Sequence, residues 1–220
     1  MSNTDVKQIS CPKCNHINEL RVYKTINATT DPQFREKLLG GQLFNFQCVG
    51  CGFEAALKYP VLYNDMKYRF MVYYIPEIDK DHVVDSELEA EYSQLSDVTK
   101  RLADSYNVMK EKIHIFESGL DDRAIELTKL AVSEIVTRKT GEKINQAFFS
   151  IYNKDTNTIG FTFFVGENNE QFVQSTRLEI YEKSADIVDS VAGKDKASQG
   201  FVTIDKEWAE NVLYRYKKGI

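Results

Sequence analysis

Cys11-Pro12-Lys13-Cys14 and Cys48-Val49-Gly50-Cys51 decide the fold of the first part of this chain. The two stretches contain every cysteine of the sequence, arranged as two C-x-x-C pairs. One such turn brings two sulfurs close to the same ion, and two turns complete a tetrahedral four-thiolate site. Tetrahedral S₄ coordination is typical of zinc or of iron–sulfur centres. The sequence therefore predicts one Zn²⁺ with four ligands: Cys11, Cys14, Cys48 and Cys51.

Each cysteine pair has the local chemistry of a zinc knuckle. Pro12 fixes φ inside the first turn and stiffens it. After the second cysteine of each pair the backbone turns with positive φ, a conformation that Gly52 adopts freely and that Asn15 tolerates. The residue types on both sides of the site therefore agree with the metal-binding interpretation.

Other uses of the four thiols stay open at this stage. Two disulfides would need an oxidising compartment, but Met1 to Ser10 is polar and shows no secretory signal. A redox sensor or redox enzyme would form a disulfide between Cys11 and Cys14 or between Cys48 and Cys51. We prefer zinc because a redox dithiol does not require a second pair of cysteines. Since the sequence shows neither a secretory signal nor an apolar run that could span a bilayer, we expect a cytoplasmic protein.

Length, charge and hydropathy limit the classes of partner. A chain of 220 residues forms one large domain or two small ones. No apolar run is long enough to span a bilayer, so no membrane partner is expected. The formal net charge is −5 and there is no dense Lys/Arg run, which argues against non-specific binding to phosphate backbones.

The elements around the cysteines predict a β-rich domain with an inserted helix. Residues 20–26 alternate with period two, as in a half-buried strand. Asp31 and Pro32 begin a helix that Gly40-Gly41 ends. Further strands are expected over 43–47 and 53–59. The arrangement predicts a zinc-ribbon or rubredoxin-like domain over residues 1–80, in which the helix lies between the two metal half-sites.

Tyr68 to Ile75 is apolar or aromatic on both faces, which predicts a strand that is covered on both sides. We expect the second cover to be the C-terminal half or a partner. Five nearby aromatic residues could also form a stacking platform for bases: Tyr63, Tyr68, Phe70, Tyr73 and Tyr74. Few basic residues are interleaved with them, so a core or a protein interface is the preferred interpretation.

Several segments together resemble one protein family. The matching segments are Cys11-Pro12-Lys13-Cys14, Asp31-Pro32, Leu38-Leu39-Gly40, Phe46-Gln47-Cys48-Val49-Gly50-Cys51-Gly52 and Tyr59-Pro60-Val61-Leu62-Tyr63-Asn64-Asp65. They are similar to the CpXC family, a bacterial and archaeal domain defined by two C-P-x-C pairs. The resemblance covers residues 8–76 and implies metal binding. The second pair here lacks the proline, and the segments Glu111-Lys112-Ile113 and Gly119-Leu120-Asp121-Asp122 resemble parts of longer members.

The rest of the chain predicts a connector and a second α+β domain. Residues 81–105 are expected to be a charged connector, helical from Ser86 through Leu88, Tyr92, Leu95 and Leu102. Residues 106–220 are expected to pack a helical pair against a small antiparallel sheet. The pair consists of a helix from Ser105 to Gly119 and a helix from Asp121 to Thr140-Gly141.

A sheet and two more helices are predicted after this pair. Strands are expected over 147–152, 158–165 and 171–174 because the period changes to two. Ser175 is expected to cap the next helix, and Asp205 is expected to cap the last one.

Signals for catalysis are few, and no catalytic residue is predicted. His16 follows the first knuckle and is interpreted as a surface residue or as a residue that contacts a metal ligand. His114 is interpreted as a packed helix residue, and His82 as part of the charged link. Asp121-Asp122-Arg123 could bind a cation, but helix capping is the preferred interpretation.

The preferred function is a structural zinc protein that acts as a protein-interaction or scaffold module, binding a protein partner or itself. The first alternative is a thiol-based redox sensor or enzyme. The second alternative is a nucleic-acid-binding zinc ribbon, against which the acidic balance argues.

Overall fold

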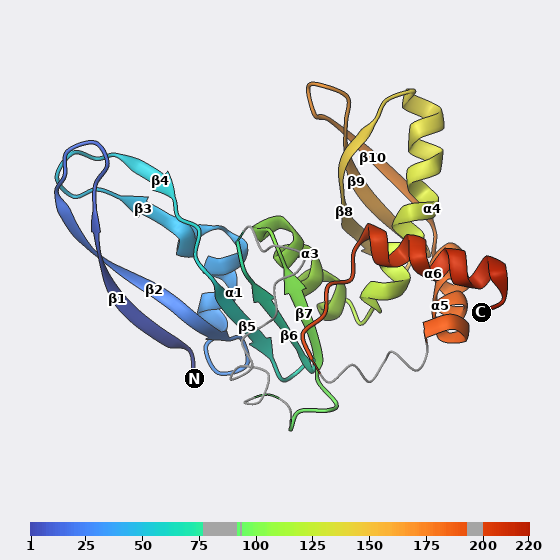
Figure 1. Cartoon of the computed structure of the whole chain (residues 1–220), viewed down its shortest axis with the longest axis horizontal. Helices are drawn as coiled ribbons and strands as arrows, with labels where there is room; N and C mark the ends of the chain where they lie inside the picture. Colours follow the sequence, from blue (N-terminus) through green and yellow to red (C-terminus); the bar gives the residue numbers. More distant parts are fainter. Residues whose placement is uncertain (77–91, 93, 193–199) are drawn as a thin grey trace. The chain divides into compact units, whose positions relative to one another are not determined.

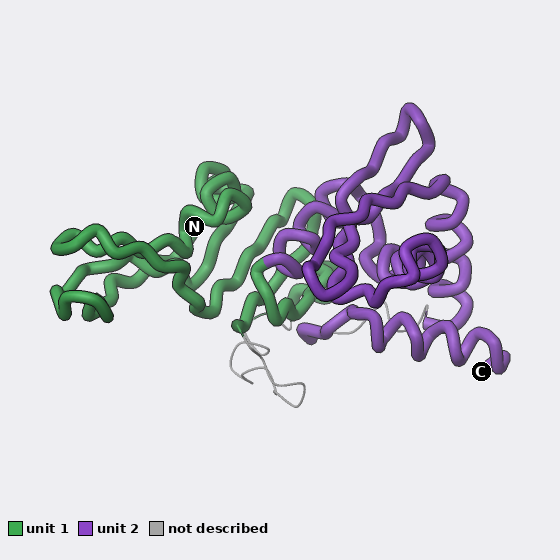
Figure 2. Tube along the Cα trace, turned by 90° about the horizontal axis from the view of Figure 1, so that it is seen from above, with its two compact units in different colours: residues 1–106 green, residues 107–220 purple. Residues whose placement is uncertain are grey.

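Runs of strands and runs of helices follow one another along the described chain, which confirms the mixed α+β class. The computed structural model describes residues 1–76, 92, 94–192 and 200–220. It divides the chain into two compact units, Met1–Tyr106 and Asn107–Ile220, shown in green and purple in Figure 2. Each unit has its own sheet and its own core.

Unit 1 is built on a five-stranded sheet with the order β1-β2-β5-β6-β7 (Figure 1). Its strands are β1 (Asn3–Ser10), β2 (Ile17–Asn27), β5 (Val61–Asp65), β6 (Phe70–Tyr74) and β7 (Thr99–Ala103). The β1–β2 and β5–β6 pairs are antiparallel, whereas β2–β5 and β6–β7 are parallel. Every residue of β5 is buried, as expected for an inner strand that is covered on both faces.

A second, two-stranded sheet of unit 1 carries the second cysteine pair. It pairs β3 (Asn45–Gln47) with β4 (Glu54–Ala56). Between the two cysteine pairs the chain forms α1 (Pro32–Leu39) and the 3₁₀ helix η1 (Gln42–Phe44), so the inserted helix is present. The turn between β1 and β2 and the turn between β3 and β4 lie side by side at one end of unit 1 (Figure 1).

One strand of unit 1 was missed, and two local predictions were wrong. The polar stretch that forms β1 was not assigned as a strand. Leu43 and Phe44 lie in η1, because Gly41 (φ 76°) turns the chain just before them. Asp31 precedes α1 without capping it, since its Oδ2 accepts hydrogen bonds from Ser2 N (2.7 Å) and Thr30 Oγ1 (2.9 Å).

The predicted helix after Ser86 was wrong at its end. Leu102, which was assigned to that helix, lies in β7 and is buried against the sheet of unit 1. Residues 77–91 and 93 lie outside the described part of the chain, and so do Leu88 and His82. The apolar spacing that suggests a helix therefore belongs in part to an edge strand of the sheet.

The expectation of a strand covered on both faces is confirmed for β6. Phe70, Met71, Val72 and Tyr74 are all buried. Since β6 pairs with β5 on one side and β7 on the other, it is an inner strand of the sheet. Its apolar character is therefore explained by the core of unit 1, and it does not offer a surface for a partner.

Unit 2 packs helices against a three-stranded antiparallel sheet with the order β10-β9-β8. Its elements are α3 (Tyr106–Glu117), α4 (Asp122–Thr140), β8 (Ile144–Asn153), β9 (Thr158–Val165), β10 (Glu170–Arg177), α5 (Leu178–Ala192) and α6 (Lys206–Lys218). One core cluster joins α4 to the sheet through Ile125, Val132, Phe161 and Phe163. The helical pair and the small sheet agree with the sequence prediction.

The helix boundaries of unit 2 follow the predicted caps in most cases. The Asp121 carboxylate accepts a hydrogen bond from Arg123 N, and the Asp205 carboxylate accepts one from Trp208 N. Gly141 ends α4 in the left-handed conformation, with φ 71°. Ser175 was wrong as a cap, because β10 continues to Arg177 and α5 begins one residue later.

Candidate metal centre

The first cysteine pair lies in the tight turn between β1 and β2. Cys11 N donates to His16 O (2.9 Å), and Asn15 N donates to Cys11 O (2.9 Å). Asn15 has φ 56°, so it makes the left-handed turn that the sequence predicts. These backbone bonds fold the chain back on itself and leave the two sulfurs on the same side of the turn.

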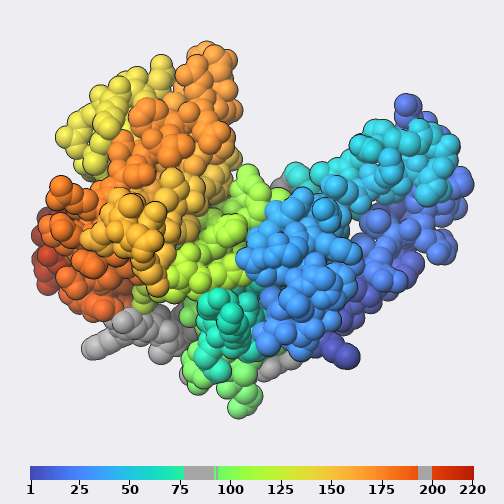
Figure 3. All heavy atoms as spheres, turned by 180° about the vertical axis from the view of Figure 1, so that it is seen from behind, coloured from blue at the N-terminus to red at the C-terminus, as the bar shows by residue number. Residues whose placement is uncertain are grey.

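The second pair repeats this geometry in the turn between β3 and β4. Cys48 N donates to Phe53 O (2.8 Å), and Gly52 N donates to Cys48 O (2.9 Å). Gly52 has φ 70°, the counterpart of Asn15. Figure 3 shows the residues around position 50, in cyan, on the surface at one end of unit 1.

The structure brings the four sulfurs together. All four Sγ atoms lie within 4.8 Å of one another, with 3.7 Å between Cys11 and Cys51 and 3.6 Å between Cys14 and Cys48. A Zn–S bond of about 2.3 Å places the sulfurs of a regular tetrahedron about 3.8 Å apart, whereas a disulfide needs about 2.05 Å. The four cysteines are free thiols at a spacing that could hold a metal ion.

Burial divides the four cysteines into two inner and two outer residues. Cys11 and Cys48 are buried, and Cys14 and Cys51 are exposed. The inner two pack in a small apolar cluster with Phe46, which Phe53 and Leu57 border. In this part of the unit the apolar core is small, so the cysteines themselves form much of it.

Asn18, on β2, joins the two knuckles and was missed by the sequence analysis. Its Nδ2 donates to His16 O (2.9 Å) and to Cys48 Sγ (3.6 Å), while its Oδ1 accepts from Val49 N (2.9 Å). The side chain is buried at 5% exposure. A polar residue early in a strand gave no signal for this role, because its partners in the second knuckle lie 30 and 31 residues away in the sequence.

Hydrogen bonding distinguishes Cys48 from Cys14. Burial raises the pKa of the Cys48 thiol, but hydrogen bonds from the Gly50 and Cys51 backbone and from Asn18 outweigh burial and lower this pKa to about 6. For Cys14 a backbone hydrogen bond at His16 lowers the pKa, yet the neighbouring thiols and desolvation raise it to about 12. Cys48 is therefore favoured as a thiolate before any ion binds.

His16 lies beside the second knuckle rather than among the sulfurs. A Cβ at Gly50 would lie 3.0 Å from His16 Cβ and Cγ, so the histidine packs on the glycine. Among the described residues, the four cysteines form the only group of three or more potential metal ligands whose ligand atoms lie close together. His16 is exposed, in agreement with its interpretation as a surface residue, whereas His114 is also exposed and the prediction that it is packed was wrong.

The residues of the other candidate sites have structural roles in capping, ion pairing or core packing. Asp121 caps α4, and Asp122 is completely buried in an ion pair with Lys112 (2.9 Å). Of the proposed base-stacking residues, Tyr63, Phe70 and Tyr74 are buried, so they offer no platform for bases.

The sequence comparisons identify the family of this chain. The family model of the CpXC protein matches residues 9–129, more than half of the chain. The chain belongs to the CpXC family. No curated protein and no solved structure matches it.

The family match includes more than the cysteine-containing unit. It continues through α3 and the first part of α4, so it contains the Glu111-Lys112-Ile113 segment that resembles longer CpXC members. Among the described residues of this CpXC protein, no helix is long and apolar enough to cross a membrane.

Proposed function

We propose that Cys11, Cys14, Cys48 and Cys51 bind one Zn²⁺ and that the ion has a structural role. The observation that carries this proposal is the spacing of the four sulfurs, with contacts of 3.6 and 3.7 Å. Four thiolates complete the coordination sphere of zinc, so no position is left for water or substrate. The ion would join the β1–β2 turn to the β3–β4 turn where the apolar core is small.

Cobalt substitution tests the geometry of this site. The protein should bind one equivalent of Co²⁺ and show the ligand-field and thiolate charge-transfer absorption of a tetrahedral tetrathiolate complex. Zn²⁺ should then displace the cobalt. An octahedral cobalt spectrum, or a spectrum that Cys14→Ser leaves unchanged, would contradict a site made of four thiolates.

The proposed biological role is a cytoplasmic protein-interaction or scaffold module that binds a protein partner or a second copy. Supporting this role, Val49 lies at the second knuckle with 82% of its surface exposed. Its backbone N–H is held by Asn18, so the side chain is presented on a fixed turn. Burial of this aliphatic side chain in an apolar pocket of a partner would contribute about 1.5–3 kcal/mol.

Val49→Ser tests this role without touching a cysteine. We expect the variant to keep its bound zinc and to lose self-association or capture of a purified partner. Val173→Ser is the matched control, because Val173 is also exposed (51%) but lies in β10 of unit 2. Equal association of the wild-type protein and Val49→Ser would remove the support for an interaction site at the knuckle.

A thiol-based redox role is the second candidate, favoured by the exposure of Cys14 and Cys51. The short sulfur contacts join Cys11 to Cys51 and Cys14 to Cys48, so oxidation would form disulfides between the two pairs rather than within them. A redox sensor should release its metal rapidly under mild peroxide. Slow release under conditions that oxidise free thiols would exclude this role.

A further inference from the structure

Unit 2 contains a groove that is separate from the cysteine site. The groove has a volume of about 790 Å³ and runs between α4, β8 and the start of α6, with α3 at its floor. All of its lining residues belong to unit 2. Its volume falls within the range of about 300–1,000 Å³ that is common for small-molecule sites.

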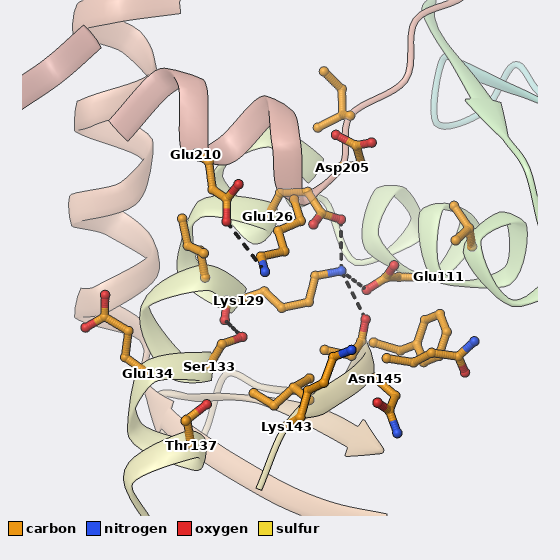
Figure 4. A pocket seen from close by; sticks show the side chains of 18 of the residues that line it. Glu111, Glu126, Lys129, Ser133, Glu134, Thr137, Lys143, Asn145, Asp205 and Glu210 are labelled. Carbon is orange, nitrogen blue, oxygen red and sulfur yellow. Dashed lines mark hydrogen bonds and ion pairs between the residues drawn. The ribbon is translucent and has the colours of Figure 1, made fainter. Parts of the chain in front are cut away.

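The floor of the groove is formed by Glu111, Glu126 and Lys129 (Figure 4). Lys129 Nζ donates to Glu111 Oε1 (2.8 Å), to Glu126 Oε1 (2.9 Å) and to Ala147 O (3.3 Å). These three acceptors use all three protons of the ammonium group. The floor therefore has no free lysine proton for an anionic ligand.

Both floor carboxylates keep one oxygen available. Glu111 Oε1 also accepts from Phe149 N (2.6 Å), and Glu126 Oε1 also accepts from Lys112 Nζ (3.4 Å). Within the described chain, all the hydrogen bonds of the two groups go to Oε1, and neither Oε2 is sealed away from solvent. The two residues are only 4% and 5% exposed, so these oxygens are acceptors at the bottom of the groove.

The negative charge is concentrated at the floor. Behind Glu126, Lys112 pairs with the buried Asp122, and this pair adds no net charge. When both carboxyl groups are ionised, the floor has two carboxylates and one ammonium, which leaves one excess negative charge. The mouth is balanced, because it has three acids and three bases: Glu134, Asp205, Glu210, Arg138, Lys143 and Lys206.

The shape and the walls of the groove favour an organic cation over a metal ion. Two carboxylates supply far fewer oxygens than the roughly six to eight that Ca²⁺ binds, and Mg²⁺ held by two carboxylates would have to keep several waters beside apolar walls. In the described chain no third acidic ligand joins them in a metal-binding group. Leu130, Ile144 and Phe148 add half-buried apolar surface along the walls.

We propose that this groove binds a small organic cation whose ammonium or guanidinium group donates to Oε2 of Glu111 and Glu126. The apolar part of the ligand packs against Leu130, Ile144 and Phe148. The ligand neutralises the excess charge of the floor, and its charge-assisted hydrogen bonds form where water is largely excluded. Neither the cysteines nor unit 1 is needed for this binding.

Calorimetric titration of the full zinc-loaded chain with three probes tests the proposal. The probes are n-butylguanidinium, n-butylammonium and the neutral n-butylurea, which has nearly the shape of the first. We expect saturable binding of n-butylguanidinium, at least about tenfold tighter than that of n-butylurea, because only the cation forms charge-assisted hydrogen bonds. Equal binding of the two, or no binding of either cation, would overturn the proposal.

Glu111→Gln tests the residue assignment with little change of structure. The amide oxygen can keep the bonds from Lys129 and Phe149, while the free oxygen becomes an N–H donor. We expect this variant to weaken n-butylguanidinium binding by about tenfold or more. Glu167→Gln removes an exposed charge from the turn between β9 and β10, outside the groove, and should leave binding unchanged. If the two variants lose affinity equally, the floor does not recognise the cation.

Discussion

Asn18 contacts both halves of the cysteine site through one side chain. It accepts from Val49 N in one knuckle and donates to His16 O in the other, as well as to Cys48 Sγ. Groups that hydrogen-bond to metal ligands orient them and adjust their basicity. Asn18 therefore helps to keep Cys48 as a thiolate and to fix the register of the two turns.

Asn18→Asp should weaken zinc binding by about 10–100-fold. The new carboxylate removes the N–H donor to Cys48 and places a negative charge beside the thiolates. Competition with a chromophoric chelator measures the change in affinity. Asn168→Asp is the control, because it makes the same substitution in an exposed turn of unit 2 and should have no effect.

At the scale of residues, rules based on a residue and its sequence neighbours predicted backbone conformations but did not predict long-range hydrogen bonds. Asn15 and Gly52 were identified because positive φ is a property of the residue and its immediate neighbours. Asn18 was not, because its function arises only when two turns far apart in the sequence meet. A single sequence therefore predicts features that depend on neighbouring residues better than features that depend on distant ones.

The elements of unit 2 are joined by a buried charge cluster. Lys112 on α3 is completely buried and donates to Asp122 (2.9 Å) and Glu126 (3.4 Å) on α4. It also donates to Ile204 O (2.7 Å), in the segment that leads into α6. One ammonium group thus links three parts of the chain in an environment where charges need partners.

Lys112→Met should lower the free energy of unfolding by about 3–5 kcal/mol, because it leaves Asp122 buried without its cation. A urea denaturation curve, monitored by a spectroscopic signal that arises from unit 2, measures this loss. Glu134→Gln, which breaks an exposed pair with Arg138, should cost less than about 1 kcal/mol. A Lys112→Met loss as small as that of the control would contradict the structural role of the cluster.

Glu111 should give unit 2 a distinctive pH dependence. Burial raises the pKa of this carboxyl above its ordinary value, against the attraction of Lys129. The folded state therefore binds this proton more tightly than the unfolded state, and stability is lost as pH rises from the ordinary value of 4.5 through the folded pKa.

The comparison of wild type with Glu111→Gln isolates this contribution. We expect the free energy of unfolding of the wild type to fall relative to the variant as pH rises above about 4.5. Denaturation curves at several pH values measure the difference. A difference that does not change with pH would show that the Glu111 pKa is not raised.

At the scale of elements, the sequence predicted helices with strong caps and strands bounded by turns. Asp121, Gly141 and Asp205 mark helix ends by local hydrogen bonds, so they were identified correctly. β1 was missed because its polar stretch gains order by pairing with β2. Leu102 was misassigned because β7 pairs in parallel with β6, and spacing along the chain does not predict such a pairing.

The whole molecule consists of two units with different sources of stability. Unit 2 has a continuous apolar core between its helices and its sheet. At the metal end of unit 1, the core cluster consists of two cysteines and Phe46 with a few bordering side chains. The zinc proposal therefore makes the ion contribute to the stability of unit 1 at this end, whereas the stability of unit 2 should not depend on it.

Cys48→Ser should unfold unit 1 and leave unit 2 folded. The substitution removes a buried ligand and its contacts in the small cluster around Phe46. Limited proteolysis should then cleave unit 1 before residue 100 and leave unit 2, Asn107–Ile220, resistant. Ser10→Ala, next to the first pair, is the control and should resist cleavage. Equal resistance of Cys48→Ser and the wild type would contradict the role of the cysteines in folding.

The metal content of the purified protein tests the central claim most directly. Elemental analysis should be combined with titration of the thiols before and after a strong chelator. The account predicts one zinc per chain and four thiols that react only after the metal is removed, because a four-thiolate site engages every cysteine. Iron, the absence of metal, or four thiols that react freely from the start would contradict it.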